Sequence, residues 1–335
     1  MFNFIAKKLI NLYKKENKNV FDKIASFFVR EYMINRDRFY TSKNFSRVFL
    51  KARHIKRMAV NGKIDFVSFE DSFIWTLSWI KQFPVRYDIV VGIPRSGLFI
   101  ANIIALKLGI PLATTDNLLF GKKWKSKYIG DGKCRRILLV DDSVDSGESM
   151  RVDYNKLKNR FGDCKITKAA LIVTPKSKKS VDLFFKSIPQ PRLFEWNLLH
   201  SKKGSLAVDL DGVLCENPKN NLEADEKKYV KWIKNAKPYL IPAFEVDVIV
   251  SCRLEKYRAE TKKWLKKNGV KYKELILWDL PSRKERQGMH ISYKVKNIIN
   301  YKPDYFWESS FHEAEGIYSK TKIPTLCVDE MIFFS

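Results

Sequence analysis

The pattern of hydrophobic and polar positions divides the chain into three regions. Up to residue 80, apolar side chains recur at roughly helical spacing, as at Phe21, Ile24, Phe27 and Phe28, which predicts helices. From Tyr87 on, short runs rich in β-branched residues alternate with helical patterns. The predicted elements of this second region are strand Asp88–Val91, helix Leu98–Leu108, strand Ile137–Val140, helix Ser149–Phe161 and strand Ala169–Val173. Strands that alternate with helices in this way predict a parallel α/β sheet.

A second α/β series follows a connector. Residues 187–204 contain two prolines and show no clear period, which is typical of a link between domains. The predicted strands of the third region are Leu206–Leu210, Val246–Val250, Glu274–Leu277, Tyr305–Trp307 and Thr325–Val328. A length of 335 residues suits two cores. We therefore expect an α/β chain with a basic helical extension over 1–80, a first domain over 81–186, the connector, and a second domain over 205–335.

The charge of the chain is strongly positive. Lys and Arg number 63 against 37 Asp and Glu, a formal net charge of +26, which favours anionic partners such as phosphorylated substrates, nucleic acid or an anionic membrane. Residues 1–60 hold fifteen of these basic residues and four acidic ones. A basic amphipathic helix there can lie on anionic lipid, although we favour packing of its apolar face on the next domain.

Cysteine usage and hydropathy bear on the compartment. The five cysteines are scattered without a CxxC pair, which is typical of free thiols in a reducing compartment. Ile89–Leu112, the most apolar stretch, is interrupted by Arg95 and Lys107 and does not qualify as a membrane span. The first residues do not have the charge order of a signal peptide. We predict a cytoplasmic protein, with peripheral contact at the inner face of the membrane as a further option.

Acidic and small residues follow the predicted strand Ile137–Val140. The strand runs directly into Asp141 and Asp142. The loop that leads into the next helix contains Asp145, Ser146, Gly147, Glu148 and Ser149. Adjacent carboxylates at the carboxyl end of a strand can accept hydrogen bonds from ribose hydroxyls, and a Ser-Gly turn before a helix offers N–H groups to a phosphate. This pattern predicts a site for a pentose 5-phosphate.

The stretch from Ile137 to Met150 resembles the signature of the type I phosphoribosyltransferases. The resemblance implies that the substrate is phosphoribosyl diphosphate (PRPP), that the paired acids hold its ribose hydroxyls and that the loop binds its 5-phosphate. It also implies that Asp145 acts as general base on the incoming nucleophile. Ser146 stands where these enzymes usually have Thr, and it keeps the hydroxyl. Magnesium-assisted departure of diphosphate through an oxocarbenium-like transition state is the implied reaction.

An earlier segment, Val90–Gly97, is similar to the diphosphate loop of the same family. Gly97 permits close approach of the backbone, and Arg95, next to Ser96, can pair with phosphate oxygens through its fork of N–H donors. Between the two motifs lies a lysine-rich segment, which is either a closing loop or a solvated one. Its candidates for charge stabilisation are Lys122, Lys123 and Lys125.

A second pair of acids, Asp209 and Asp211, lies at the end of the predicted strand Leu206–Leu210. A carboxylate there can attack phosphorus, and a second acid can protonate the leaving oxygen. The sequence Asp-Leu-Asp-Gly-Val resembles motif one of the haloacid dehalogenase (HAD) superfamily, and residues similar to its later motifs appear in order. Those residues are Ser251 as a phosphate donor, Lys294 as the neutralising lysine and Glu308 as the motif-four acid.

The HAD resemblance implies a Mg²⁺ site. Asp209, the backbone carbonyl of Asp211 and Glu308 would hold the ion, while Ser309 stands where a second motif-four acid is common. Lys296 is the alternative to Lys294. Residues 216–245 leave room for only a small helical cover. Arg253 and Arg258 are either substrate contacts or surface charges.

The two resemblances together predict a bifunctional enzyme. It would transfer 5-phosphoribosyl from PRPP to a hydroxyl of a glycan or lipid-linked acceptor and then remove the 5-phosphate, leaving ribofuranose. This is similar to the transferase and phosphatase pair that builds ribofuranose into bacterial polysaccharides. The alternatives are a nucleobase phosphoribosyltransferase with an attached nucleotidase, and a PRPP-sensing regulator that binds nucleic acid, which the complete acid sets disfavour. A homodimer is typical of the transferase fold, but nothing in the sequence decides the oligomeric state.

Overall fold

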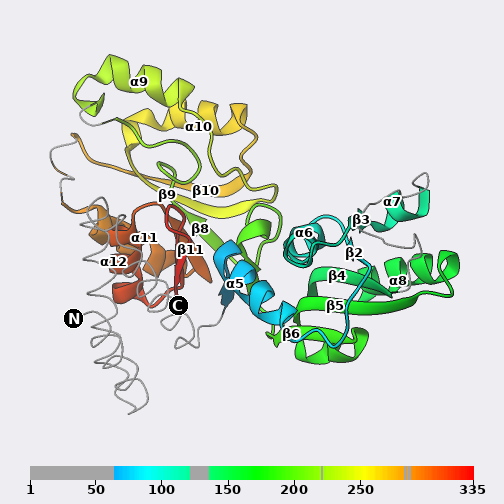
Figure 1. Ribbon diagram of the computed structural model, residues 1–335. Coiled ribbons are helices and arrows are strands. Elements are labelled where there is room, and N and C mark those ends of the chain that lie inside the picture. Colours follow the sequence, from blue (N-terminus) through cyan, green and yellow to red (C-terminus); the bar gives the residue numbers. More distant parts are fainter. Residues whose placement is uncertain (1–63, 121–135, 220–221, 283–284, 286–287) are drawn as a thin grey trace, which may run out of the picture. The chain divides into compact units, whose positions relative to one another are not determined.

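The computed structural model describes residues 64–120, 136–219, 222–282, 285 and 288–335. The helical pattern predicted for residues 1–63 and the three candidate lysines at 122, 123 and 125 lie outside these ranges. The described elements belong to the unit Lys63–Phe334 and are labelled in Figure 1.

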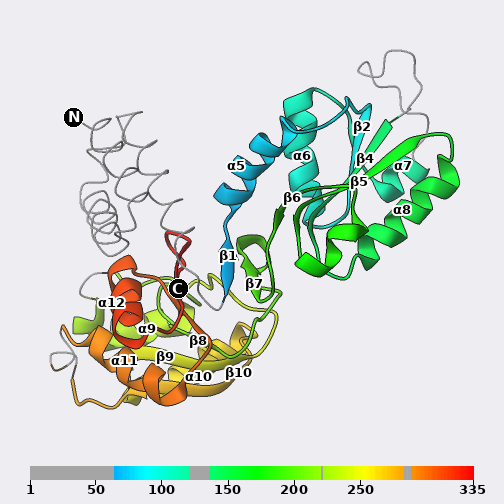
Figure 2. The ribbon, with the colours of Figure 1, turned by 90° about the horizontal axis from the view of Figure 1, so that it is seen from below.

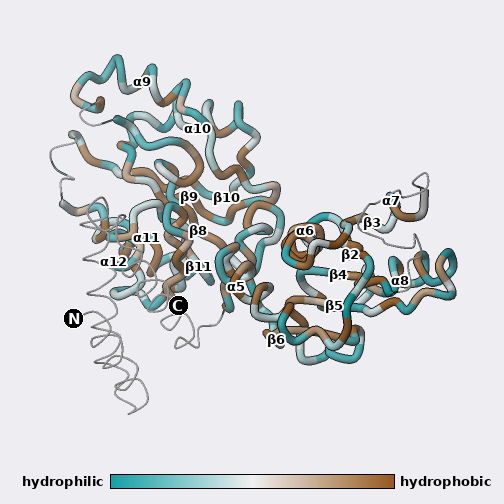
Figure 3. Tube along the Cα trace, in the orientation of Figure 1, coloured by the Kyte–Doolittle hydropathy of each residue, from teal (hydrophilic) through white to brown (hydrophobic). Residues whose placement is uncertain are grey.

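The first sheet has five parallel strands in the order β3-β2-β4-β5-β6. Their bounds are β2 Ile89–Gly92, β3 Leu112–Thr114, β4 Arg136–Val144, β5 Lys165–Val173 and β6 Leu183–Ser187. The central strands are continuous apolar runs because helices cover both faces of a parallel sheet. Figure 3 shows β2, β4 and β5 as mainly hydrophobic tubes. The predicted strands of this region are confirmed, and β3 and β6 are added at its edges.

Two helices cover each face of this sheet. Helices α5 (Phe69–Ile80) and α6 (Gly97–Leu108) share one hydrophobic cluster with Leu138 and Val140 of β4. Helices α7 (Thr115–Phe120) and α8 (Glu148–Arg160) share the other cluster with Ile137 and Leu139. Figure 2 shows α6 and α8 on opposite sides of the strands. The alternation of side chains along β4 thus divides its apolar residues between the two layers.

A short two-stranded sheet joins the start of the described chain to the connector. Strand β1 (Asp65–Val67) pairs in parallel with β7 (Arg192–Phe194). The helical prediction for residues 1–80 is therefore wrong at β1 and right at α5, whose N-terminus is fixed by a capping box between Ser68 and Asp71. Each of these strands has only three residues, which is too few to show a hydrophobic periodicity, so the sequence does not predict either of them.

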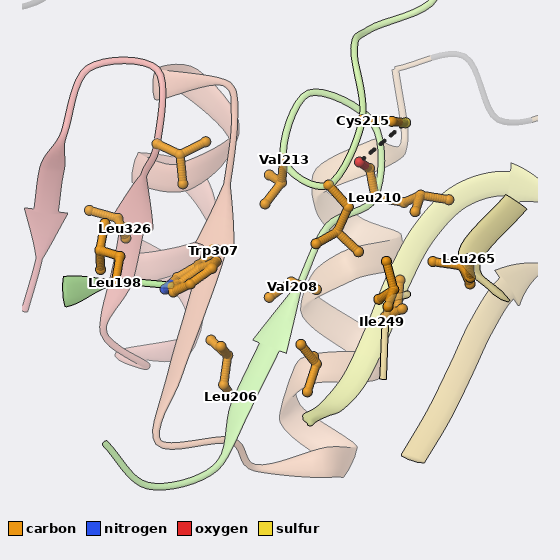
Figure 4. Close-up of a cluster of buried hydrophobic side chains, with 14 of the residues drawn as sticks. Leu198, Leu206, Val208, Leu210, Val213, Cys215, Ile249, Leu265, Trp307 and Leu326 are labelled. Atoms are coloured by element: carbon orange, nitrogen blue, oxygen red, sulfur yellow. Dashed lines mark hydrogen bonds between the residues drawn. The ribbon is translucent and has the colours of Figure 1, made fainter. Parts of the chain in front are cut away.

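The second sheet has six strands in the order β10-β9-β8-β11-β12-β13, parallel except for the edge strand β13. Their bounds are β8 Leu206–Val208, β9 Val246–Leu254, β10 Tyr272–Trp278, β11 Tyr305–Glu308, β12 Thr325–Cys327 and β13 Ile332–Phe334. The predicted strands of the third region are confirmed. Figure 4 shows one face of this sheet, where Val208, Ile249 and Trp307 form a common core.

Four further helices surround the second sheet. They are α9 Glu226–Asn235, α10 Arg258–Lys267, α11 His290–Tyr301 and α12 Phe311–Thr321. Trp264 of α10 packs in the cluster of Figure 4, and Ile298 of α11 and Ile317 of α12 pack on the opposite face. Helix α9 lies in the range 216–245, where a small helical cover is expected, and its Tyr229 and Ile233 pack with Leu254 and Tyr257. None of the described helices combines the length and hydrophobicity that crossing a membrane requires.

Asp247 fastens the connector to the start of the second sheet. Its buried carboxylate accepts hydrogen bonds from the N–H of Leu206 (2.8 Å) and from Lys273 (2.7 Å), and it forms an ion pair with Lys202. Burial by itself raises the pKa of Asp247. The hydrogen bonds outweigh this effect and lower the pKa from its ordinary value of 3.8 to about 2.

We predict that Asp247→Asn lowers the free energy of unfolding by about 2 kcal/mol at pH 7. Because the folded-state pKa of Asp247 is depressed, its contribution is complete above about pH 4 and is lost as the pH falls through about 2. Urea denaturation followed by tryptophan fluorescence at several pH values measures this difference. Glu274→Gln, an exposed carboxylate on β10, is the control and should change stability by less than about 0.5 kcal/mol. Equal effects of the two substitutions would contradict the assignment.

Candidate active sites

Two loops meet at the carboxyl ends of β2 and β4, which are neighbouring strands of the first sheet. The N–H of Ile93 donates a hydrogen bond to the carbonyl of Val140 (2.9 Å) and ties the loop after β2 to β4. A Cβ atom on Gly97 would lie 2.8 Å from that same carbonyl oxygen and 3.0 Å from Asp141 Oδ1. Only glycine allows this approach. The predicted diphosphate loop therefore lies directly against the paired acids.

The paired acids at the end of β4 are held by hydrogen bonds. The N–H of Asp142 donates to Asp141 Oδ1 (2.9 Å), and the indole N–H of Trp196 donates to Asp142 Oδ2 (2.7 Å). Burial, together with the charge of Asp142, raises the pKa of Asp141 well above its usual range. Asp141 therefore retains a proton more readily than an ordinary carboxyl, and the pair can both donate to and accept from neighbouring hydroxyls.

The predicted phosphate loop leads into α8 through Gly147. This glycine has a φ of 81°, and a Cβ atom there would lie 2.7 Å from Ser180 Oγ, so the turn excludes larger residues. The N–H of Glu148 donates to Ser146 Oγ (3.3 Å), while the Glu148 carboxylate pairs with Arg151 (2.6 Å). The positive end of α8 and its first N–H groups thus lie beside Ser146, as a phosphate site requires.

The segment of residues 190–197 borders both motifs. Four of its side chains are hydrogen-bonded to residues of the predicted site, in the pairs Gln190–Asp145 (3.0 Å), Arg192–Ser143 (2.8 Å), Trp196–Asp142 (2.7 Å) and Asn197–Arg95. The sequence assigns this segment to the connector and predicts no function for it. Its one signal is the density of aromatic and charged side chains between Arg192 and Asn197, which is unusual for a linker.

Aromatic rings surround the indole that binds Asp142. Trp196 stacks on Phe194, with centroids 4.9 Å apart and an interplanar angle of 1°. Phe69 of α5 and Phe99 of α6 lie 5.7 Å and 6.3 Å from the Trp196 ring. These contacts fix the orientation of the indole and hence of its N–H donor.

In the second sheet, the ammonium group of Lys294 lies among three carboxylates. Its Nζ donates to Asp209 Oδ2 (2.7 Å), Glu308 Oε2 (2.6 Å) and Glu313 Oε2 (2.7 Å). Lys294 is 3% exposed and is provided by α11, while Asp209 and Glu308 follow or end the adjacent strands β8 and β11. The structure thus brings Asp209, Lys294 and Glu308 together, as the sequence predicts. Glu313 was missed because it lies on α12, outside the motifs.

The protonation of this cluster follows from its burial. Burial raises the pKa of Asp209 to about 8, against the opposing effect of Lys294. Although burial disfavours the charged lysine, Asp209 and Glu308 hold the pKa of Lys294 well above its usual range. Burial likewise opposes ionisation of Glu313, but hydrogen bonds from His290 and Lys294 lower its pKa to about 2. The ammonium therefore stays charged while the carboxyls around it differ in acidity.

The side chain of Asp211 is paired with a buried arginine. Nε of Arg253 lies 3.1 Å from each carboxylate oxygen of Asp211, and Nη2 lies 2.6 Å from Oδ1. Arg253 is fully buried and lies over the ring of Trp232, so the surface position considered for it is wrong. Asp211 reaches a leaving oxygen as a proton donor only if this ion pair opens.

The remaining residues of the second motif set lie around the same strand ends. Ser251 is buried within β9, where its Oγ accepts from the N–H of Arg253 (3.2 Å). Gly212 has a φ of 80°, and a Cβ atom there would lie 2.4 Å from Ser309 Oγ. Gly212 therefore cannot carry a side chain while Ser309 lies beside it.

The oxygen groups fit a hard divalent cation in part. One oxygen each of Asp209 and Glu308 is directed at the position of the Lys294 ammonium, and the backbone carbonyl of Asp211 accepts from Ser309 Oγ (3.4 Å). Two carboxylates and a carbonyl suit Mg²⁺, which keeps several water ligands. Within the described ranges, no group of three or more His, Cys, Asp or Glu side chains is arranged as a metal site. These three groups would hold the ion, which neutralises phosphoryl oxygens.

Four other candidates, Ser96, Ser149, Lys296 and Arg258, lie outside the two clusters described above. Ser96 occupies the N-cap position of α6 without a capping hydrogen bond, and Ser149 is exposed in the first turn of α8. Lys296 is exposed on α11, so Lys294 alone of the two lysines reaches the acids. Arg258 forms an ion pair with Glu255.

Comparison with known proteins gives a family match for the part of the chain that holds the first sheet. Residues 79–201 match the family model of the phosphoribosyl transferase domain. Among solved structures, the xanthine-guanine-hypoxanthine phosphoribosyltransferase of Helicobacter pylori is 24% identical, with coverage of 40% of this chain and 91% of that chain and a TM-score of 0.33. The purine phosphoribosyltransferase of Pyrococcus horikoshii is 20% identical, with coverage of 39% and 92% and a TM-score of 0.31.

The family match confirms the type I phosphoribosyltransferase domain that the sequence motifs predict. The matched residues, 79–201, include every predicted residue of the first site and also residues 190–197. The HAD-like assignment of the second sheet stays a prediction.

We predict that Lys294→Met lowers the free energy of unfolding by about 3–5 kcal/mol, because it leaves three clustered carboxylates without their counter-ion. The loss should be larger at pH 8 than at pH 6, where the carboxyls can take up protons instead. Denaturant titration measures both values. Lys296→Met, on the exposed side of the same helix, is the matched control with an expected change below about 0.5 kcal/mol. A loss that is equal for the two lysines would contradict the described cluster.

Proposed function

We propose that the chain is a bifunctional enzyme, a PRPP-dependent phosphoribosyltransferase joined to a HAD-like phosphatase. The observation that carries the first activity is the contact between the Gly97 loop and Asp141 at the adjacent ends of β2 and β4, within a phosphoribosyl transferase domain. Ligands of open α/β sheets bind at this edge.

In the transfer step, each group has a defined task. Asp141 and Asp142 bind the ribose hydroxyls, the N–H groups of the loop and of the first turn of α8 bind the 5-phosphate, and Arg95 pairs with the diphosphate. The bond from the anomeric carbon to the diphosphate oxygen breaks as the bond to the acceptor oxygen forms. Asp145 takes the acceptor proton, since one of its oxygens is held by Gln190 and the other remains available.

The second step removes the 5-phosphate. Asp209 attacks phosphorus while Lys294 neutralises the phosphoryl oxygens, and water then hydrolyses the aspartyl-phosphate. The cluster of Asp209, Lys294 and Glu308 supports this assignment. The bond between phosphorus and the C5 oxygen of the ribose breaks as Asp209 attacks. Once its ion pair with Arg253 opens, Asp211 takes up a proton from water and gives it to this leaving oxygen.

The pairing of the two activities points to a glycan acceptor. Dephosphorylation would waste the product of nucleotide salvage, whereas on a glycan it converts an added phosphoribosyl group into a neutral ribofuranose. We therefore propose a hydroxyl of a glycan or lipid-linked sugar as the acceptor. Nucleobase transfer is the second candidate, because the rings of Phe69 and Trp196 beside Asp142 could stack on a planar base.

The test uses Asp209→Asn, which silences the phosphatase and leaves the transferase site intact. The variant is incubated with PRPP, Mg²⁺ and separate panels of sugars and nucleobases, and added mass is followed by mass spectrometry. We expect a phosphoribosyl group on a sugar, and only a ribosyl group when the unmodified protein is used. Adding Asp145→Asn to this variant should slow transfer by about 10²–10⁴-fold.

Asp163→Asn, an exposed carboxylate of the same domain, is the control and should leave transfer unchanged. Transfer to nucleobases alone would replace the proposed glycan acceptor by a nucleobase and assign the protein to nucleobase salvage. PRPP binding without transfer, together with salt-sensitive binding of nucleic acid, would replace the proposal by a regulatory function. Persistence of the 5-phosphate with the unmodified protein would remove the phosphatase from the proposal.

A further inference from the structure

A cavity of about 190 Å³ lies beside the proposed general base. Asp145 and Ser143 line it from the end of β4 and the loop that follows. Its other lining residues come from the segment after β6 and are Gln190, Arg192, Leu193, Phe194, Asn197, Ser201 and Lys203. The acceptor hydroxyl must lie within reach of Asp145, so this cavity is where the acceptor binds if the proposed function is correct.

Arg192 places a buried positive charge on the wall of this cavity. The residue is 2% exposed, and its guanidinium donates to uncharged acceptors, namely the carbonyls of Ile188 (3.0 Å) and Val144 (3.1 Å) and Ser143 Oγ (2.8 Å). Its Nε has no hydrogen-bond partner. Within the described part of the chain Arg192 forms no salt bridge. Burial, opposed by the more distant Asp145 and Asp142, lowers its pKa.

A buried guanidinium without a carboxylate partner is costly, since the protein must replace its hydration. Lys203 adds a second positive charge to the same wall, and its ammonium likewise forms no salt bridge with a described residue. Against these two charges the lining contains one carboxylate, that of Asp145. The cavity therefore has an excess of one positive charge next to the group that would take the acceptor proton.

We propose that the acceptor is a sugar that bears an anionic group, a phosphate or a carboxylate, which binds in this cavity near Arg192 and Lys203. The inference rests on the proposed transfer and names the chemical class of its acceptor. The anion compensates the charge of Arg192, and it holds the acceptor hydroxyl beside Asp145. A neutral sugar of the same shape leaves the excess charge of the cavity unmatched and binds less well.

Binding is measured first, independently of turnover. Asp209→Asn protein saturated with ribose 5-phosphate, which occupies the phosphoribosyl site, is titrated calorimetrically with a hexose, its 1-phosphate and the corresponding uronic acid. We expect one or both anionic sugars to bind at least about tenfold more tightly than the hexose. Preference for the phosphate or for the carboxylate identifies the source of the anion.

Lys203→Gln and Arg192→Gln should each remove most of this preference while leaving ribose 5-phosphate binding unchanged. Lys176→Gln, an exposed lysine of the same domain with the same change of charge, is the control and should retain it. Arg192 is buried, so Arg192→Lys, which keeps the charge, is compared with Arg192→Gln. If both Arg192 variants destabilise the fold, Lys203→Gln alone provides the test. Equal affinity for neutral and anionic sugars, or equal behaviour of Lys203→Gln and Lys176→Gln, would overturn the inference.

The transfer assay separates this inference from the proposed function. Transfer to neutral sugars at the same kcat/KM as to anionic ones would leave the proposed function standing and refute the acceptor class. Selective binding of anionic sugars without transfer would support the cavity assignment and count against the proposed reaction.

Discussion

Carboxylates buried side by side repel one another, and each sheet of this protein places such a pair at the carboxyl end of a central strand. Asp141 and Asp142 lie near the end of β4, which continues to Val144, and Asp209 and Asp211 follow β8. What makes both arrangements stable is a set of donors from distant segments. The indole of Trp196 serves the first pair, and the ammonium of Lys294 and the guanidinium of Arg253 serve the second. The same groups that balance the charge also orient the carboxylates, so stability and chemistry depend on the same contacts.

The sheets could be predicted because their central strands are buried on both faces. Runs such as Ile137–Val140 and Val248–Val250 are continuous and apolar, and the polar residues that follow them mark the sites. The acids that end or follow these strands can be grouped from the sequence, since the carboxyl ends of parallel strands share one edge. Ser251, Lys294 and Glu308 were predicted from the resemblance to the HAD motifs. Short elements carry no such signal. Strands β1 and β7 have three residues each and pair with one another across more than a hundred positions of sequence.

The parts of the sites that the sequence did not predict are all long-range polar contacts. Glu313 lies one turn into α12, and its contact with Lys294 depends on how α11 and α12 pack on the second sheet. The ion pair between Asp211 and Arg253 joins a residue just after β8 to one in β9, 42 positions apart, and a pattern of hydrophobic residues does not encode such a contact. Gln190 and Trp196 belong to a stretch with no period at all, so nothing in the sequence relates them to Asp145 and Asp142.

The hydrogen bonds of residues 190–197 also determine where the polypeptide can be divided. A boundary placed at residue 186, where the periodic pattern stops, would produce a transferase fragment without the donors to Asp142, Ser143 and Asp145 and without β7, the partner of β1. A boundary after Lys203 keeps all of them, together with the full lining of the cavity. Residues 190–203 are therefore needed for a complete transferase domain. A fragment for recombinant production should end after Lys203.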